Sequence, residues 1–167
     1  MLESVLSEFQ QVIDTLIADG WFPVFFLFAS QKTWEQTLLD DWLKNHPASA
    51  YQIVGEQDPR AVKAAIAQCD VAFGVAYHFV IFALTTGVPV RALYGGRYYS
   101  NKMKGALRFF GLEEWAFPYE SVECQALVSS LEKLAGDTAL PDQLRERSVV
   151  VEASHRDVVS KYVQLPT

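Results

Sequence analysis

Cysteines, long apolar runs and N-terminal basic residues are all scarce in this sequence. Its two cysteines, Cys69 and Cys124, are too far apart to suggest a metal site and are typical of reduced thiols in a cytoplasmic protein. The apolar runs 21–29 and 71–84 are interrupted and fall short of the roughly 20 residues that a membrane-spanning helix needs. Residues 1–19 carry acids but no Lys or Arg, unlike a secretory signal. We therefore expect cytoplasmic localisation, no membrane span and no metal site.

Positive charge is scarce overall, with 14 Lys and Arg residues against 20 Asp and Glu residues and a net charge of −6. A protein that coats nucleic acid needs the opposite balance, so we expect no nucleic-acid partner. Half of the 167 residues are apolar and a fifth are charged. This composition excludes a disordered chain and is sufficient for the core of about one domain.

Apolar periodicity alternates between the helical and the extended type along the chain. It predicts one doubly wound, mostly parallel, Rossmann-like α/β sheet over residues 1–167, with 117–167 mostly helical. Thr33 and Gln36 form a possible capping box, and Asp58-Pro59 is a typical helix start. The predicted strands are 24–28, 51–54, 71–76, 88–94 and 115–117, and the predicted helices are 2–17, 34–43, 59–69, 78–86, 100–110, 122–134 and 142–162.

The predicted domain opens on a helix, whereas doubly wound domains usually begin with a strand at the centre of the sheet. Without that strand, the strands 24–28 and 71–76 lose the neighbour that normally lies between them. Both are apolar, and an unpaired apolar strand edge is a template for pairing with another chain. The two strands could instead close up and pair directly. We expect a homodimer or an obligate partner, such as a missing N-terminal half, rather than a stable monomer.

Acidic residues are absent from one long internal segment. The 42 residues between Asp70 and Glu113 contain no Asp or Glu. The basic residues in this segment are Arg91, Arg97, Lys102, Lys104 and Arg108. The segment predicts a site for an anionic small molecule, and the alternative interpretation is a solvated basic helix over 100–110.

Two turns of this segment follow predicted strands. Tyr77 and His78 lie where strand 71–76 passes into a helix, and Gly95-Gly96 ends the next strand. Ligands of open α/β sheets bind at the carboxyl ends of strands, where helix N-termini offer free N–H groups to anions. An imidazole at that place can bind phosphate or move a proton, so His78 is a candidate site residue. The alternative is a buried histidine that the backbone satisfies.

The stretch DVAFGVAYHFVIFALTTGVPVRALYGG, from Asp70 to Gly96, resembles the C-terminal domain of polysaccharide pyruvyl transferases. The pattern of that family is an aspartate and an apolar strand, then Gly-x-Arg-x-His, an apolar helix and Gly-Val-Pro-Val before another strand. The resemblance is specific over 74–90 and looser over 6–134. It implies the second of two Rossmann-like halves, as in the two-domain GT-B glycosyltransferases. The residues in step with the pattern are Gly74, His78, Ala83, Gly87, Val88, Pro89 and Val90.

The resemblance implies the phosphoenolpyruvate-binding half of an enzyme that adds a pyruvyl ketal to sugar hydroxyls in polysaccharide synthesis. Its donor would be phosphoenolpyruvate, its acceptor a sugar or glycan, and no other cofactor is implied. His78 would be catalytic. The family arginine two residues before the histidine is Ala76 here, and Arg97 and Lys102 are expected to replace it. The residues expected to bind substrate or phosphate are Gly74, Tyr77, His78, Gly95, Gly96, Arg97 and Lys102.

Two other functions stay open at this point. One is the nucleotide-sugar-binding half of a GT-B glycosyltransferase, but such halves usually hold sugar hydroxyls with a carboxylate after the Gly-Val-Pro segment. This chain has no acid there. The other is a non-catalytic remnant or a subunit of a split enzyme, because the motif arginine and the acceptor-side half of the family are not found in these residues.

Overall fold

The computed structural model describes residues 2–28, 34–55 and 58–162 of the chain. Short strands alternate with helices through most of these ranges, and residues from 119 onward are helical apart from short connections. Three single 3₁₀ turns, 48–50, 113–115 and 119–121, join some of the elements. The elements are α1 (Leu2–Ala18), β1 (Val24–Phe26), α2 (Trp34–Leu43), β2 (Gln52–Val54), α3 (Pro59–Ile66), β3 (Ala72–Gly74), α4 (Tyr77–Thr86), β4 (Val90–Tyr94), α5 (Gly96–Arg108), β5 (Ala116–Pro118), α6 (Cys124–Gly136) and α7 (Leu140–Tyr162).

The strands form two separate parallel sheets. One sheet is the pair β1-β2, and the other has the order β3-β4-β5 with β4 in the centre. The expected α/β class with parallel strands is confirmed. The expectation of one continuous sheet is wrong, because β1 and β3 do not pair with each other. The alternative in which these two strands close up is therefore also wrong.

Aromatic contacts hold β1 against α4 instead. The ring of Phe26 lies 5.6 Å from that of Phe79, and the ring of Phe28 lies 5.9 Å from Phe79 and 6.4 Å from Phe82. On the β2 side, Phe25 packs against Trp42 and Tyr51. These large side chains tie β1 to the helices and to β2, so that it does not move across to β3.

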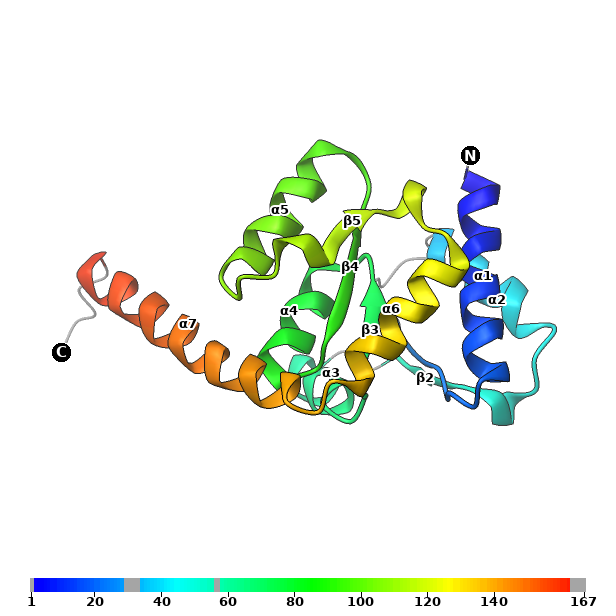
Figure 1. The fold of residues 1–167 in the computed structure, drawn as a ribbon, viewed down its shortest axis with the longest axis horizontal. Coiled ribbons are helices and arrows are strands. Elements are labelled where there is room, and N and C mark those ends of the chain that lie inside the picture. The colour runs from blue at the N-terminus through cyan, green and yellow to red at the C-terminus, as the bar shows by residue number, and fades with distance from the viewer. Residues whose placement is uncertain (1, 29–33, 56–57, 163–167) are drawn as a thin grey trace.

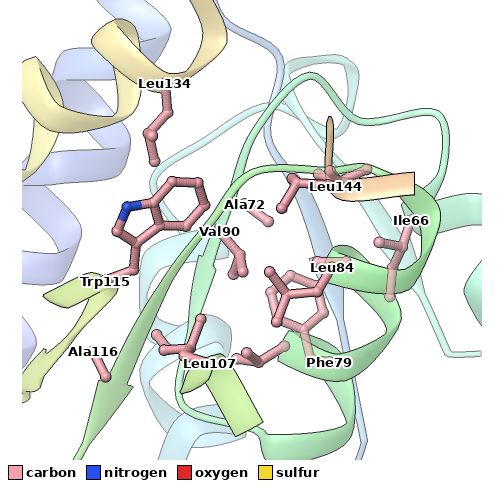
Figure 2. Close-up of a cluster of buried hydrophobic side chains, with 14 of the residues drawn as sticks. Ile66, Ala72, Phe79, Leu84, Val90, Leu107, Trp115, Ala116, Leu134 and Leu144 are labelled. Carbon is pink, nitrogen blue, oxygen red and sulfur yellow. The ribbon is translucent and has the colours of Figure 1, made fainter. Parts of the chain in front are cut away.

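Two apolar clusters lie on opposite faces of the β3-β4-β5 sheet. Val90 and Ala92 of β4 belong to the cluster with α3, α4, α5 and α7, and Leu93 belongs to the cluster with α1 and α6. This division follows from the alternation of side chains along a strand. Figure 2 shows the first cluster, and Figure 1 shows α1 beside α6 and α7 extending away from the rest of the molecule.

Local signals for helix ends are confirmed at several positions. The side chain of Asp58 accepts a hydrogen bond from the backbone N–H of Arg60 at 2.9 Å, with Pro59 as the first residue of α3. Gly87 ends α4 with φ +85°, in the left-handed region that glycine favours. The capping box predicted at Thr33 lies outside the described residues.

The start of α5 differs from the prediction. We expect a helix from Ser100, but α5 begins at Gly96, with Gly95 in extended conformation as its N-cap. Serine is a favoured N-cap residue and glycine is accepted there too, so residue preference alone does not decide between the two starts. The difference matters for the site, because it brings the glycine pair and Arg97 into the first turn of a helix.

His46 takes part in a contact between two helices. Its ring stacks on Trp42 at 3.7 Å, and its Nε2 lies 3.0 Å from a carboxylate oxygen of Asp14. The indole N–H of Trp42 donates to the same oxygen at 2.8 Å. This group of three side chains joins α1 to the end of α2.

Candidate functional site

The first part of the candidate site is the N-terminus of α4. β3 ends at Gly74, and α4 begins at Tyr77 after the N-cap Ala76, which makes no side-chain capping bond. The first intrahelical bond runs from Val80 N–H to Ala76 C=O at 3.1 Å, so the N–H groups before it have no helical partner. The first turn carries no acid, and His78 is exposed there. These free N–H groups and the positive end of the helix dipole favour an anion.

The second part is the N-terminus of α5, at the end of the neighbouring strand. β3 and β4 are parallel, with Gly74 opposite Ala92, so both strands end at the same edge of the sheet. Gly95 makes no side-chain capping bond, and the first turn of α5 again has no acid. Arg97 lies in this turn and is exposed. Two adjacent helix N-termini therefore present the same polarity at this edge.

Lys102 connects the two helices. Its Nζ lies 4.3 Å from the centre of the Tyr77 ring, a cation–π contact between α5 and the first turn of α4. The Tyr77 ring in turn lies 5.6 Å from that of His78. Within the described part of the chain, no carboxylate forms an ion pair with His78, Arg97 or Lys102. The positive charge of Lys102 and Arg97 is therefore available to a ligand.

A mostly apolar cavity of about 980 Å³ divides the predicted site residues into two groups. Gly74, Tyr77, Gly95 and Lys102 line it, together with Tyr99 and Tyr119. His78, Gly96 and Arg97 are not among its lining residues and lie on the exposed side of the two helix N-termini. A ligand at the site would therefore have one side toward the cavity and the other toward solvent.

The basic residues of the acid-free segment do not all join this site. Arg108 pairs with Glu113 at 3.1 Å, at the far end of α5. Arg91 lies over the ring of Trp115 at 5.7 Å, and burial lowers the pKa of its guanidinium, with Glu114 opposing that shift. Lys104 lies over the ring of Tyr94 at 5.6 Å. Of the α5 residues, Lys102 contacts the start of α4, and Arg97 lies in the first turn of α5.

Tyr119 is a site residue that the sequence gives no reason to select. It follows β5, and its ring lies so close to Gly95 that a Cβ at that position would overlap it. The absence of a side chain at Gly95 therefore allows the ring to close over the start of α5. No spacing or motif signals a contact between residues this far apart in the chain.

We expect Gly95→Ala to lower the free energy of unfolding by about 1–3 kcal/mol, because the new methyl group must displace the Tyr119 ring. The matched control is Gly105→Ala, in the middle of α5, where a Cβ meets nothing within 4 Å. That change should instead stabilise the protein by up to about 1 kcal/mol through helix propensity. Urea unfolding of both variants measures the difference, and equal effects would contradict the contact between Gly95 and Tyr119.

Cys69 also lines the cavity, but its chemistry is that of a core thiol. Burial raises the pKa of the Cys69 thiol above its usual range, and the nearby Asp70 carboxylate raises it further. The thiolate is the nucleophilic form, so a raised pKa lowers reactivity at neutral pH. The other cysteine, Cys124, lies half-buried with its sulfur 3.7 Å from the hydroxyl oxygen of Thr15. Both cysteines are free.

Membrane-spanning helices and metal-binding clusters are both missing from the described residues. No helix in the described ranges is long and apolar enough to cross a membrane. No group of three or more His, Cys, Asp or Glu side chains among the same residues is placed to hold a metal ion.

The parallel strands, with helix N-termini at one edge, define a domain of the open α/β class. The family model of polysaccharide pyruvyl transferases matches residues 2–96, more than half of the sequence. The chain therefore belongs to the polysaccharide pyruvyl transferase family, which is a family of transferases. The match contains β3, α4 and β4 and ends at the first residue of α5. The looser resemblance over 97–134 lies outside it.

The fold is also that of a solved glycosyltransferase. A crystal structure described as the glycotransferase of kitacinnamycin superposes with a TM-score of 0.55 at 13% identity, over 89% of this chain. The chain spans 44% of the length of that protein. At this identity the likeness concerns the fold alone. No curated protein matches the sequence.

Proposed function

We propose that this chain is the phosphoenolpyruvate-binding half of a pyruvyl transferase. The observation that carries the proposal is the pair of acid-free, uncapped N-termini of α4 and α5, with Lys102 reaching from α5 to the first turn of α4. Phosphoenolpyruvate carries a phosphate and a carboxylate, and both groups favour helix N-termini and lysine or arginine. Family membership supplies the reaction class.

His78 is the residue we propose for catalysis. It lies exposed in the first turn of α4, beside free N–H groups that can bind the phosphate. In the proposed reaction, an acid protonates the methylene carbon of the enol, and two sugar hydroxyls attack the neighbouring carbon. The bond from that carbon to the phosphate oxygen breaks, the hydroxyl protons leave, and phosphate and the ketal are the products. Imidazole can either donate that proton or hold the phosphate.

Lys102 and Arg97 are proposed to supply the positive charge that Ala76 does not. Lys102 has the stronger support, since its Nζ lies against Tyr77, the residue that follows Ala76. Arg97 occupies the first turn of α5 on the exposed side. Gly96 would let the ligand approach the backbone closely, because nothing lies within 4 Å of where its side chain would be. Gly74 and Gly95 line the cavity at the two strand ends, and the rings of Phe79 and Tyr119 occupy the space beside them.

The acceptor side of the reaction is proposed to lie on another polypeptide segment. The sugar or glycan acceptor needs a second binding surface, and this chain spans less than half the length of the related glycosyltransferase. The 167 residues are therefore proposed to bind the donor, with transfer requiring the complementary half. Cytoplasmic localisation goes with this proposal and rests on the two reduced cysteines.

The second candidate function is the nucleotide-sugar-binding half of a glycosyltransferase. Two observations favour it: the fold of the related solved structure and the exposed rings of Tyr98 and Tyr99. These rings lie 5.1 Å apart in the first turns of α5 and could stack on a base or a sugar. The missing acid after the Gly-Val-Pro segment argues against it, since no carboxylate is there to hold sugar hydroxyls.

Calorimetric titration of the purified chain with phosphoenolpyruvate tests the first function. We expect binding in the micromolar to millimolar range, and Lys102→Ala should weaken it about 10-fold or more, because a hydrogen bond to a charged group contributes about 1.5–3 kcal/mol. The matched control is Arg108→Ala, which removes the same charge from the far end of α5 and should leave the affinity unchanged.

Uridine diphosphate in the same experiment separates the alternatives. Binding of the nucleotide without binding of phosphoenolpyruvate would favour the glycosyltransferase half. If neither compound binds while the chain is folded by circular dichroism, a non-catalytic remnant becomes the better interpretation. An equal loss of affinity in the Lys102 and Arg108 variants would mean that the overall positive charge of α5, and not a defined site, attracts phosphoenolpyruvate.

A further inference from the structure

The two separate sheets leave a space between β1 and β3, hereafter the strand gap. The cavity of about 980 Å³ is lined by both strands, with Phe25 and Phe26 on one side and Phe73 and Gly74 on the other. Among the residues that the structure describes, β1 pairs only with β2, and β3 only with β4. Each strand therefore has one edge without a neighbouring strand, and these two edges border the same cavity.

The hydrogen bonds on the paired edges show which residues direct their backbone groups toward the unpaired edges. Leu27 donates to Val54 at 3.2 Å and Ala72 donates to Pro89 at 2.8 Å, so these residues direct their N–H groups toward the paired side. Alternate residues of a strand direct theirs to the opposite side. Val24 and Phe26 of β1 and Phe73 of β3 therefore present their N–H and C=O groups on the unpaired edges.

The backbone N–H and C=O groups of Val24, Phe26 and Phe73 have no strand partner beside this apolar cavity, and they favour a hydrogen-bonding occupant. These residues are half-buried, and a backbone group that becomes fully buried without a partner costs free energy. An apolar ligand such as an acyl chain would cover these groups without bonding to them, whereas a β-strand between β1 and β3 can bond to both edges. We propose that the strand gap binds a β-strand from outside these 167 residues, parallel to β1 and β3, which joins the two sheets into one.

The surroundings fix the chemistry of the inserted strand. On one face the cavity is lined by Phe9 and Ile13 of α1, and on the other by Phe79 of α4. Side chains of a strand alternate between the two faces, so both sets would meet apolar neighbours. The sequence of a strand that is buried on both faces is typically a continuous run of apolar residues. The occupant is therefore an uncharged run of about five or six residues, rich in Val, Ile and Leu.

A second copy of this chain is a poor source for that strand. In the described ranges, each of the strands β1 to β5 already pairs within its own sheet, so a copy has none to donate without losing one. The related solved structure contains more than twice the length that this chain covers. The source that fits is the polypeptide with the remaining part of the transferase fold. This inference concerns assembly and does not depend on which donor the site binds.

Hydrogen exchange with a synthetic strand tests the proposal on the purified chain. The probe is the capped peptide Lys-Val-Ile-Val-Leu-Val-Lys, and its control is the same peptide with alternate backbone nitrogens methylated. We expect the first peptide to slow exchange at the amides of Val24, Phe26 and Phe73 by about 100-fold at saturation. The amides of Leu27 and Ala72 are already paired and serve as internal references.

The methylated peptide should protect far less, since it retains the side chains but lacks half of the donors. Equal protection by both peptides would overturn the proposal in favour of simple apolar filling. Additional protection of only Leu27 and Ala72 would show that the peptide binds outside the strand gap, and the proposal would be wrong. If the three amides are already protected in the free chain and light scattering gives a dimer, the gap is filled by a second copy and the proposal is wrong.

A variant of the chain provides a second, independent test of the strand gap. Val24→Pro removes one N–H group from the unpaired edge and none from the bonds to β2. We expect circular dichroism like that of the unchanged chain and at least about a 10-fold loss of peptide affinity. Should this variant bind the peptide normally, β1 is not the docking edge. Phosphoenolpyruvate binding is measured in parallel, so failure of the donor site and failure of the strand gap are distinguishable.

Discussion

Leu84→Ala is expected to lower the free energy of unfolding by about 3–5 kcal/mol, near the upper end for a buried leucine. Leu84 is fully buried in α4, in the larger apolar cluster, which Figure 2 shows. Helices α3 and α7 pack against α4, and β4 lies beneath it. Because three elements surround this side chain, the structure cannot collapse easily around the cavity that the truncation leaves.

Equilibrium unfolding in urea, followed by circular dichroism, measures this loss as a shift of the midpoint without a change in slope. The matched control is Val149→Ala in α7, whose side chain is 68% exposed. That substitution should change the free energy of unfolding by no more than about 0.5 kcal/mol. A loss below about 1 kcal/mol for Leu84→Ala would mean that α4 does not lie at the centre of the core.

Gly87→Ala is expected to destabilise the protein by about 3–5 kcal/mol, through two effects at one position. Its φ of +85° is a conformation that L-residues rarely adopt. A Cβ there would also lie 2.7 Å from the carbonyl oxygen of Pro141 and 2.8 Å from Cγ of Arg145. The carbonyl is backbone, so relief of the clash requires α7 to move away from the end of α4.

Gly111→Ala separates the two effects. Gly111 has a similar φ of +72°, but a Cβ there meets nothing within 4 Å. Its replacement should therefore cost only the backbone strain, about 1–2 kcal/mol. The difference between the two variants in thermal or urea unfolding measures the packing of α7 on α4. Equal losses at both positions would falsify the close approach of these two helices.

Several elements are determined by short stretches of the sequence alone. The Asp58-Pro59 start of α3 and the glycine at the end of α4 both act over a few residues. Their energetics are local, since capping bonds and left-handed backbone depend on immediate neighbours. The segment 70–96 likewise carries a continuous sequence pattern. That pattern predicts both the strand–helix–strand unit and the family.

The sequence predicts no strand between strands 24–28 and 71–76, but it does not indicate how these two strands are then arranged. Direct pairing of strands 24–28 and 71–76 is equally compatible with their apolar composition. In the structure β1 and β3 do not pair with each other, because Phe26 and Phe28 pack against Phe79 of α4 and hold β1 in place. That choice depends on contacts between residues more than 50 positions apart.

The candidate site shows the same division. The sequence alone predicts basic residues near the ends of two parallel strands, because strand ends and charges are read along the chain. Only the tertiary structure decides that Lys102 lies over Tyr77, that Arg108 is engaged with Glu113, and that the Tyr119 ring covers Gly95. Those contacts depend on the start of α5 and on how the helices pack, and packing is fixed by the shapes of side chains that meet only in the folded chain.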